Sequence, residues 1–293
     1  MPASRTAKTQ PKLKLLEAPS LASIPWLTHG FSTRQGGRSR AYGRNALNLG
    51  FTPDDTKTAV VRNREWLVSS LGKRRRAKWE LVTLRQVHSD LIHLINRVPE
   101  HPLSGDGMIT ATAGLLLAVL TADCFPLIIA DPKRRAVGVF HAGWRGTVKR
   151  VAEKGVGEMR KHFGSIPSQL RAAIGPGIRS CCYQVGPELR NSFEAQFAYA
   201  SQLFRETKER NEIHERYPLL FLTARAPGHS DLPRQIFLDL AQANRRQLLD
   251  AGLLARNISD LGSCTSCNPE LFFSHRAQKG KTGRMMAVAG VRE

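Results

Sequence analysis

The chain has 293 residues, of which 41% are hydrophobic and 23% are charged, a composition ordinary for a globular protein that buries a substantial core. Lysine and arginine outnumber aspartate and glutamate by 44 to 24, which gives a formal net charge of +20 and attracts anions without specificity. Because the basic residues are scattered along the chain and are not interleaved with aromatic residues, the composition argues against a specific nucleic-acid-binding protein.

Residues 1–22 are predicted to form a disordered basic tail, and residues 23–293 a single catalytic domain. Pro2, Pro11 and Pro19 interrupt the tail, and no apolar stretch follows its basic residues as it does in a secretory signal. No apolar run in the sequence approaches the roughly 20 residues that a membrane-spanning helix needs. Five cysteines, an odd number, favour a reducing compartment over a disulfide framework. We therefore expect a cytoplasmic protein that does not enter the membrane.

Four apolar runs in the first half of the chain are predicted as strands. None of them alternates between apolar and polar residues, a pattern typical of strands that are buried on both faces. They cover residues 81–87, 115–120, 125–130 and 136–140. The first run ends next to His88 and the last ends next to His141.

The second half of the chain predicts three helices, one long polar loop and two closing strands. The helices are expected at 148–163, after Gly186-Pro187 and at 239–250. The loop is expected at 205–234, and the strands at 271–274 and 284–289. The succession of buried strands and amphipathic helices predicts one mixed α/β domain. We expect an α+β sandwich, in which helices cover mixed β-sheets.

Three of the predicted strand ends carry groups that can bind a metal or react. They are Gln86-Val87-His88, Ala122-Asp123-Cys124 and His141-Ala142-Gly143-Trp144. Strand ends hold reactive groups rigidly on one rim of a fold. Asp123 and Cys124 place two polar groups between two strongly apolar strands, which is costly unless function requires them. We therefore predict that His88, Cys124 and His141 form one reaction centre.

These three segments are part of a longer ordered series of motifs that spans about residues 26–290. The series comprises His29-Gly30-Phe31-Ser32-Thr33-Arg34-Gln35-Gly36-Gly37, Asn48-Leu49-Gly50, Gln86-Val87-His88, Gly105-Asp106-Gly107, Ala122-Asp123-Cys124, His141-Ala142-Gly143-Trp144-Arg145-Gly146-Thr147 and Thr282-Gly283-Arg284. It resembles the YfiH-like, or laccase-domain, family, which is named for an early polyphenol oxidase assignment and is now associated with purine nucleoside phosphorylase activity. The resemblance implies a fold similar to that of the cysteine hydrolases of the cytotoxic-necrotizing-factor type.

The resemblance also implies that His88, Cys124 and His141 are the catalytic residues and the metal ligands. Two imidazoles and a thiolate form a three-ligand zinc site whose fourth position is open to water or substrate. Zinc lowers the pKa of bound water toward neutrality, and copper can bind the same set. Without metal, the same residues form a Cys–His nucleophile pair. We predict zinc, with Asp123 as a further catalytic residue that orients a histidine or takes a proton.

Phosphorolysis requires a held phosphate and an oriented nucleoside as well. Arg34, Arg145 and Arg284 lie in the family motifs and are predicted to bind phosphate, because guanidinium groups match oxyanions in a bidentate way. Ser32 and Thr33 are predicted to contact the ribose.

We therefore predict a purine nucleoside phosphorylase that converts adenosine, inosine and S-methyl-5'-thioadenosine, with phosphate, to the free base and a ribose 1-phosphate. The same enzyme is expected to deaminate adenosine, to use small nucleosides and phosphate as its partners, and to be a monomer or a homodimer. One alternative is a cysteine hydrolase that edits peptidoglycan precursors. Another is a copper-dependent polyphenol oxidase, although the nine histidines of this chain include none of the His-x-His pairs typical of multicopper oxidases.

Overall fold

The computed structural model describes residues 13–75, 78–208 and 234–293. The chain divides into two compact units, one formed by Met1–Arg179 with Leu240–Glu293 and the other by Ser180–Asp239. The sequence led us to expect one domain over 23–293. The larger unit contains a five-stranded and a six-stranded sheet, and the smaller unit contains a three-stranded sheet.

The first sheet is built around the last strand of the chain. β15 (Met285–Val291) lies antiparallel between β2 (Leu27–Ser32) and β7 (Leu115–Thr121). β1 (Leu15–Leu16) pairs antiparallel with β2 at one edge. β4 (Glu80–Thr83) forms the opposite edge and runs parallel to β7.

The second sheet is centred on the antiparallel hairpin of β8 and β9, and its strand order is β14-β10-β8-β9-β6-β5. Its strands are β5 (Ile92–Leu94), β6 (Gly107–Thr110), β8 (Phe125–Asp131), β9 (Ala136–Ala142), β10 (Arg171–Ile174) and β14 (Ile258–Asp260). Every residue of β8 and β9 is buried, as their unbroken apolar sequences predict.

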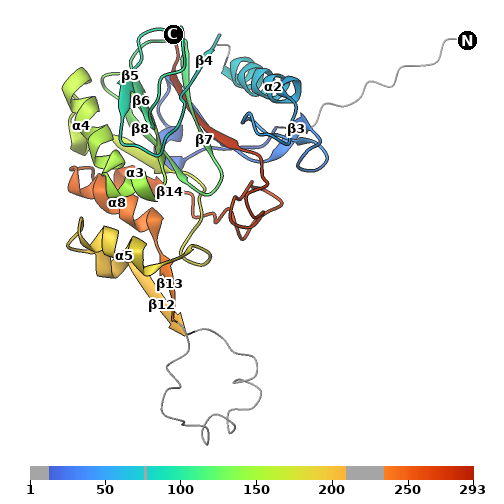
Figure 1. Ribbon diagram of the computed structural model, residues 1–293. Coiled ribbons are helices and arrows are strands. Elements are labelled where there is room, and N and C mark those ends of the chain that lie inside the picture. The colour runs from blue at the N-terminus through green and yellow to red at the C-terminus, as the bar shows by residue number, and fades with distance from the viewer. Residues whose placement is uncertain (1–12, 76–77, 209–233) are drawn as a thin grey trace, which may run out of the picture. The chain divides into compact units, whose positions relative to one another are not determined.

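The two sheets pack face to face, and helices cover their outer faces (Figure 1). Leu117 of β7 joins the core between the sheets, whereas its neighbour Leu116 points the other way and packs beneath α2 (Lys57–Arg75). On the second sheet, α4 (Val151–Phe163) packs against β9, and α8 (Leu240–Asp250) packs against α4. The predicted α/β sandwich of mixed sheets covered by helices is confirmed.

Short elements complete the larger unit. They are α1 (Pro19–Ala22), β3 (Gln35–Ser39), α3 (Trp144–Val148) and the 3-10 helices Pro167–Gln169 and Ala255–Asn257. The smaller unit is an antiparallel sheet in the order β11-β13-β12, with a cluster of aromatic rings beside it. Its elements are β11 (Gln184–Val185), α5 (Pro187–Glu194), the 3-10 helix Ala200–Leu203, β12 (Phe204–Lys208) and β13 (Arg234–Leu238).

The N-terminal tail predicted from the sequence is too long. β1 and α1 both lie within residues 13–22, and Ala18 and Leu21 are fully buried there. The backbone nitrogen of Ala18 also donates a hydrogen bond to Nε2 of His29 at 3.0 Å. The prediction of disorder is therefore wrong for residues 13–22, because these apolar residues pack on the core. Residues 1–12 lie outside the described part of the chain.

Other elements also differ from the prediction. The sequence pattern did not reveal α2, because its apolar and basic residues are mixed around the helix rather than gathered on one face. Residues 271–274 form a turn and irregular backbone, not a strand, although Phe272 and Phe273 are buried. The predicted loop 205–234 contributes β12 and β13 at its ends, and most of its length lies outside the described residues. None of the helices described is long and apolar enough to span a lipid bilayer.

Candidate active site and metal centre

His88, Cys124 and His141 converge, as their positions at strand ends predict. Cys124 immediately precedes β8 and His141 lies near the end of β9, and the pairing of Phe125 with Ala142 joins these two strand ends. Sγ of Cys124 lies 4.0 Å from Nε2 of His88. The two imidazole rings meet edge to face, with 4.9 Å between their centroids. One donor atom from each of the three residues lies within 4.8 Å of the other two.

Backbone strain is concentrated beside these residues. His88 has a φ of 56° and Asp123 has a φ of 88°, a region in which residues other than glycine are uncommon. Residues held in such conformations gather at functional sites, where the surrounding structure enforces them. The turn at His88, between β4 and β5, and the turn at Asp123, between β7 and β8, are therefore shaped by the fold rather than by local preference.

Asp106 positions two of the three residues. Its fully buried carboxylate accepts a hydrogen bond from Nδ1 of His141 at 2.8 Å through Oδ1. Through Oδ2 it accepts bonds from the backbone nitrogen of Ser89 at 2.6 Å, from the Ser89 hydroxyl at 2.7 Å and from the backbone nitrogen of Val87 at 3.2 Å. The carboxylate of Asp106 therefore keeps the proton of His141 on Nδ1, and it fixes the backbone on both sides of His88.

Burial alone raises the pKa of Asp106, but the hydrogen bonds from His141 and Ser89 outweigh it and lower the pKa to about 2. The carboxylate is therefore ionised throughout the physiological range. Sequence reasoning did not select Asp106 as a site residue. The only signal available was its place in the Gly105-Asp106-Gly107 motif.

Cys124 and His141 form a charge-coupled pair. Burial raises the pKa of the Cys124 thiol, but the opposing charge of His141 and the hydrogen bonds from both histidines lower it to about 6. Burial lowers the pKa of His141, but the Cys124 thiolate and the carboxylate of Asp106 raise it to about 9. Near neutral pH the geometry therefore favours a thiolate next to an imidazolium, and a thiolate is the form that binds metals and attacks electrophiles.

Gly143 leaves space above the cluster. A Cβ atom at this position would lie 3.0 Å from Sγ of Cys124 and 3.0 Å from Cδ2 of His88, closer than side chains normally approach. Cys124 and His88 are only partly buried, whereas His141 is buried. The absence of a side chain at Gly143 therefore keeps one side of the cluster accessible to a metal ion or a substrate.

The donor set fits a zinc ion. One thiolate and two imidazole nitrogens surround a common point, which matches the three-ligand catalytic zinc site with an open fourth position. The hydrogen bond from Nδ1 of His141 to Asp106 is the carboxylate–histidine arrangement that usually supports a metal-bound imidazole. The same donors suit copper as well.

Asp123 holds the C-terminal segment against the site. Its Oδ1 accepts a hydrogen bond from the Thr265 hydroxyl at 2.6 Å, and its Oδ2 accepts one from the backbone nitrogen of Arg276 at 2.7 Å. We predicted that Asp123 orients a histidine or takes a proton. The carboxylate that accepts a bond from His141 is that of Asp106. Asp123 instead fixes the turn that presents Cys124.

The three predicted phosphate ligands differ in how they are engaged. Arg34 donates to the backbone oxygens of Pro269 and Tyr42, both at 2.5 Å. Arg284 donates to the backbone oxygens of the two residues that precede it, each at 3.0 Å. Arg145 is exposed and its guanidinium stacks on the Trp144 ring, with no hydrogen-bond acceptor for that group among the residues described. Arg145, two residues after Gly143, is thus the arginine whose guanidinium is available to a ligand.

The hydroxyls of Ser32 and Thr33 have backbone partners. Ser32 is buried, and its Oγ accepts a hydrogen bond from the backbone nitrogen of Met286 at 2.9 Å. Thr33 is fully buried, donates to the backbone oxygen of Lys14 at 3.2 Å and accepts from the backbone nitrogen of Gln35 at 3.3 Å. These bonds join the end of β2 to its neighbours, and they leave neither hydroxyl exposed for the ribose contact that we predicted.

Comparisons with known proteins agree with the motifs. A family model described as "Multi-copper polyphenol oxidoreductase laccase" matches residues 28–292. The "Purine nucleoside phosphorylase" of Deinococcus radiodurans is 37% identical over 284 residues, which cover 97% of this chain and 95% of that protein. "Adenosine deaminase RL5", from an unknown prokaryotic organism, is 33% identical over 267 residues, which cover 87% of this chain and 90% of that protein.

A solved structure extends the likeness to the fold. The hypothetical protein YfiH of Bacillus licheniformis superposes with a TM-score of 0.78 at 31% sequence identity, over 97% of this chain and 98% of that one. The family match runs from β2 through β15 and spans every motif that carries the resemblance, so the resemblance inferred from those motifs is confirmed. The chain therefore belongs to the multi-copper polyphenol oxidoreductase laccase family, the laccase-domain family that its motifs resemble.

Proposed function

We propose that this protein is an enzyme that acts on purine nucleosides at the centre formed by His88, Cys124 and His141. In this proposal it cleaves adenosine, inosine and S-methyl-5'-thioadenosine with phosphate, and it also deaminates adenosine by hydrolysis. The observation that carries the proposal is the convergence of the three donors around a common point, with Asp106 behind His141. The names of the relatives from Deinococcus radiodurans and from the unknown prokaryote supply the substrate class.

Zinc is the metal that we propose for this centre, with His88, Cys124 and His141 as its ligands. A bound zinc ion supplies Lewis acidity, which polarises an oxygen atom and makes water a nucleophile at neutral pH. Cys124 meets the requirement for a deprotonated ligand, because its pKa lies near 6. The thiolate also favours zinc or copper over the hard cations that prefer oxygen ligands.

The residues around the centre have separate tasks in this proposal. Asp106 keeps the Nδ1 proton on His141, so that Nε2 of this ring faces the cluster. Gly143 leaves room for the nucleoside. Arg145 attracts phosphate, since its exposed guanidinium forms a fork that matches two phosphate oxygens. Fixed hydrogen-bond donors then stabilise the charge that develops on phosphate and on the departing purine. Such electrostatic stabilisation is the principal source of rate enhancement in sites of this kind.

The test is nucleoside turnover by the purified protein combined with metal analysis. Adenosine with phosphate should give adenine and ribose 1-phosphate together with inosine, and the ratio of adenine to inosine should rise with phosphate concentration. His88→Ala should lose both the metal and turnover, whereas His162→Ala, a change of a surface histidine that contacts Glu158, should retain both. Failure of the wild-type protein to form either product would refute the proposal.

A second candidate is a metal-free cysteine hydrolase. The specific observation in its favour is the ion pair of the Cys124 thiolate with the His141 imidazolium, which is the activated nucleophile of such enzymes. Chelators separate the two functions. Turnover that resists complete metal removal but is abolished by Cys124→Ser indicates the hydrolase. Oxygen consumption with phenols and stoichiometric bound copper would instead indicate the polyphenol oxidase.

A further inference from the structure

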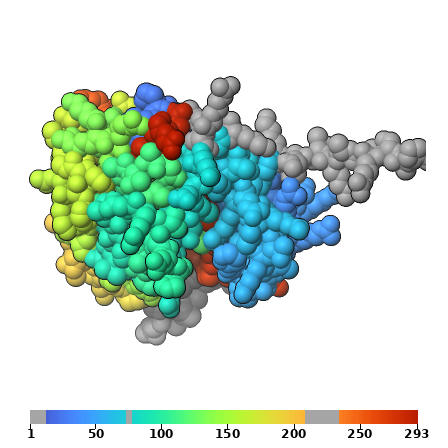
Figure 2. Space-filling model, turned by 90° about the horizontal axis from the view of Figure 1, so that it is seen from above, coloured from blue at the N-terminus to red at the C-terminus, as the bar shows by residue number. Residues whose placement is uncertain are grey.

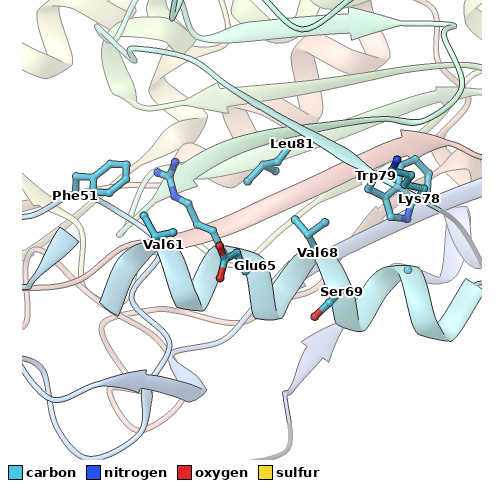
Figure 3. A pocket seen from close by; sticks show the side chains of 10 residues that line it. Phe51, Val61, Glu65, Val68, Ser69, Lys78, Trp79 and Leu81 are labelled. Carbon is cyan, nitrogen blue, oxygen red and sulfur yellow. The ribbon is translucent and has the colours of Figure 1, made fainter. Parts of the chain in front are cut away.

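A second cavity lies between α2 and the beginning of β4, and none of its lining residues belongs to the reaction centre (Figure 3). Its volume is about 850 Å³. Figure 3 shows Phe51 at one end and Trp79 and Lys78 at the other, with Val61, Val68 and Leu81 between them. Figure 2 shows the residues of α2, in light blue, forming a broad part of the surface.

The rim of this cavity exposes large apolar side chains. Phe51 is 56% exposed and Val61 is 42% exposed, although both lie beside a well-packed core. Val68 and Leu81 are only partly buried and continue the apolar lining between them. Apolar side chains that gather around a hollow mark a place where a ligand or partner covers them.

Two cations lie among these apolar groups. Nε of Arg64 donates to the backbone oxygen of Leu49 at 2.8 Å, and its guanidinium stacks on Phe51 at 4.4 Å. No carboxylate contacts this guanidinium among the residues described, and burial lowers its pKa to about 10. Lys78 is the second cation of the lining, and Glu65 is its one acidic residue. The nitrogens Nη1 and Nη2 of Arg64 are thus available to an anion at the Phe51 end.

Trp79 and Lys78 form the opposite end. Trp79 is only 7% exposed, and its indole Nε1–H has no acceptor in the part of the chain that the structure describes. The cavity therefore combines apolar walls with a few polar groups at its ends, which is the usual composition of small-molecule sites.

We propose that this cavity binds a small amphipathic carboxylate, with its carboxylate on Arg64 and its apolar chain along Val61, Val68 and Leu81. A single guanidinium matches a single carboxylate in a bidentate way. The cavity volume lies within the range of about 300–1,000 Å³ typical of small-ligand pockets. The guanidinium of Arg64 lies at one end of a continuous apolar lining, an arrangement that suits a short chain with one charged end.

Calorimetric titration of the full-length protein with decanoate tests this proposal. Decanoate should bind in the wild-type protein, and decanol should bind about tenfold or more weakly because it lacks the charge. Arg64→Met, which keeps an apolar side chain, should weaken decanoate binding about tenfold or more and leave decanol unchanged. Arg62→Met is the matched control, since Arg62 is an exposed arginine of the same helix outside the cavity lining, and it should bind decanoate as the wild type does.

A second measurement locates the ligand even where Arg64→Met fails to fold. 10-Bromodecanoate quenches nearby tryptophans, so it should quench the wild-type fluorescence. Trp79→Phe should remove most of that quenching, and Trp26→Phe should retain it. The proposal is overturned by any of three results: no decanoate binding, equal binding by Arg64→Met and Arg62→Met, or quenching that survives Trp79→Phe. Equal binding of decyltrimethylammonium would overturn it as well, because that cation shares only the apolar chain.

Discussion

Asp106→Asn isolates the contribution of the carboxylate behind His141. The change preserves size, but the amide presents two N–H donors where the carboxylate has only acceptors. Whichever way the amide is turned, it places a donor against the donors of Ser89 and Val87 or against Nδ1 of His141. The clamp on the turn at His88 and the tautomer of His141 therefore cannot both be maintained.

The pKa of Asp106 gives the size of the effect. A pKa held at about 2, against an ordinary value of 3.8, corresponds to about 2 kcal/mol of folding free energy at pH 7. Because the pKa is lowered in the folded state, this contribution is fully present above pH 3.8 and is lost as the pH falls toward 2. The stability difference between wild type and Asp106→Asn should therefore be constant between about pH 5 and 6.5 and shrink below pH 5. It should also shrink as the pH rises toward 9, because Asp106 helps to raise the pKa of His141 to about 9.

Urea unfolding at pH 7 measures the loss, and zinc competition measures the effect on the site. We expect a loss of about 2 kcal/mol and zinc binding weakened about 10- to 100-fold. Asp90→Asn is the matched control. Asp90 is a nearby acidic residue, and its partly exposed ion pair with Lys154 should contribute no more than about 1 kcal/mol. A loss below about 0.5 kcal/mol in Asp106→Asn, with zinc affinity unchanged, would refute the positioning role.

Three further outcomes follow from the same geometry. Gly143→Ala should abolish metal binding while the protein stays folded, because the added Cβ lies 3.0 Å from Sγ of Cys124. Gly157→Ala in α4 is the control and should leave metal binding intact, because a Cβ added there has no neighbouring atom within 4 Å. In the metal-free protein, alkylation of Cys124 by iodoacetamide should rise with pH around a midpoint near 6, and a midpoint near 9 would contradict the charge pairing with His141. Arg145→Ala should raise the KM for phosphate more than the KM for the nucleoside, and an equal rise of both would remove Arg145 from the phosphate site.

The sequence identifies His88, Cys124 and His141 because a reactive residue at the end of an apolar strand is a local pattern. Asp106 is not recognisable in this way, since its role depends on contacts with Ser89 and His141, 17 and 35 residues away. Arg34 shows the opposite error. Its motif suggests an anion site, but its guanidinium fixes the loops around it.

The difference between local patterns and contacts of distant residues also decides which parts of the fold are predictable. β8 and β9 are predictable because continuous apolar sequence requires burial on both faces. α2 carries no such pattern, since few of its residues, such as Val60, Leu67 and Leu71, are buried apolar side chains while many others face solvent. Phe272 and Phe273 are apolar and buried without forming a strand, because they pack into an apolar cluster from an irregular segment. Burial is therefore more predictable from this sequence than the backbone conformation that achieves it.

Two buried carboxylates hold the strained turns that present the reactive groups, and this argues against either acting as a general base. Asp106 accepts backbone N–H groups on both sides of His88, whose φ is 56°. Asp123, with a φ of 88°, binds Thr265 and the backbone of Arg276, which are 142 and 153 residues away. Protonating either carboxylate would remove acceptors from bonds that keep the backbone in an unfavourable region. The two aspartates therefore serve to keep His88, Cys124 and His141 in place rather than to exchange protons with a substrate.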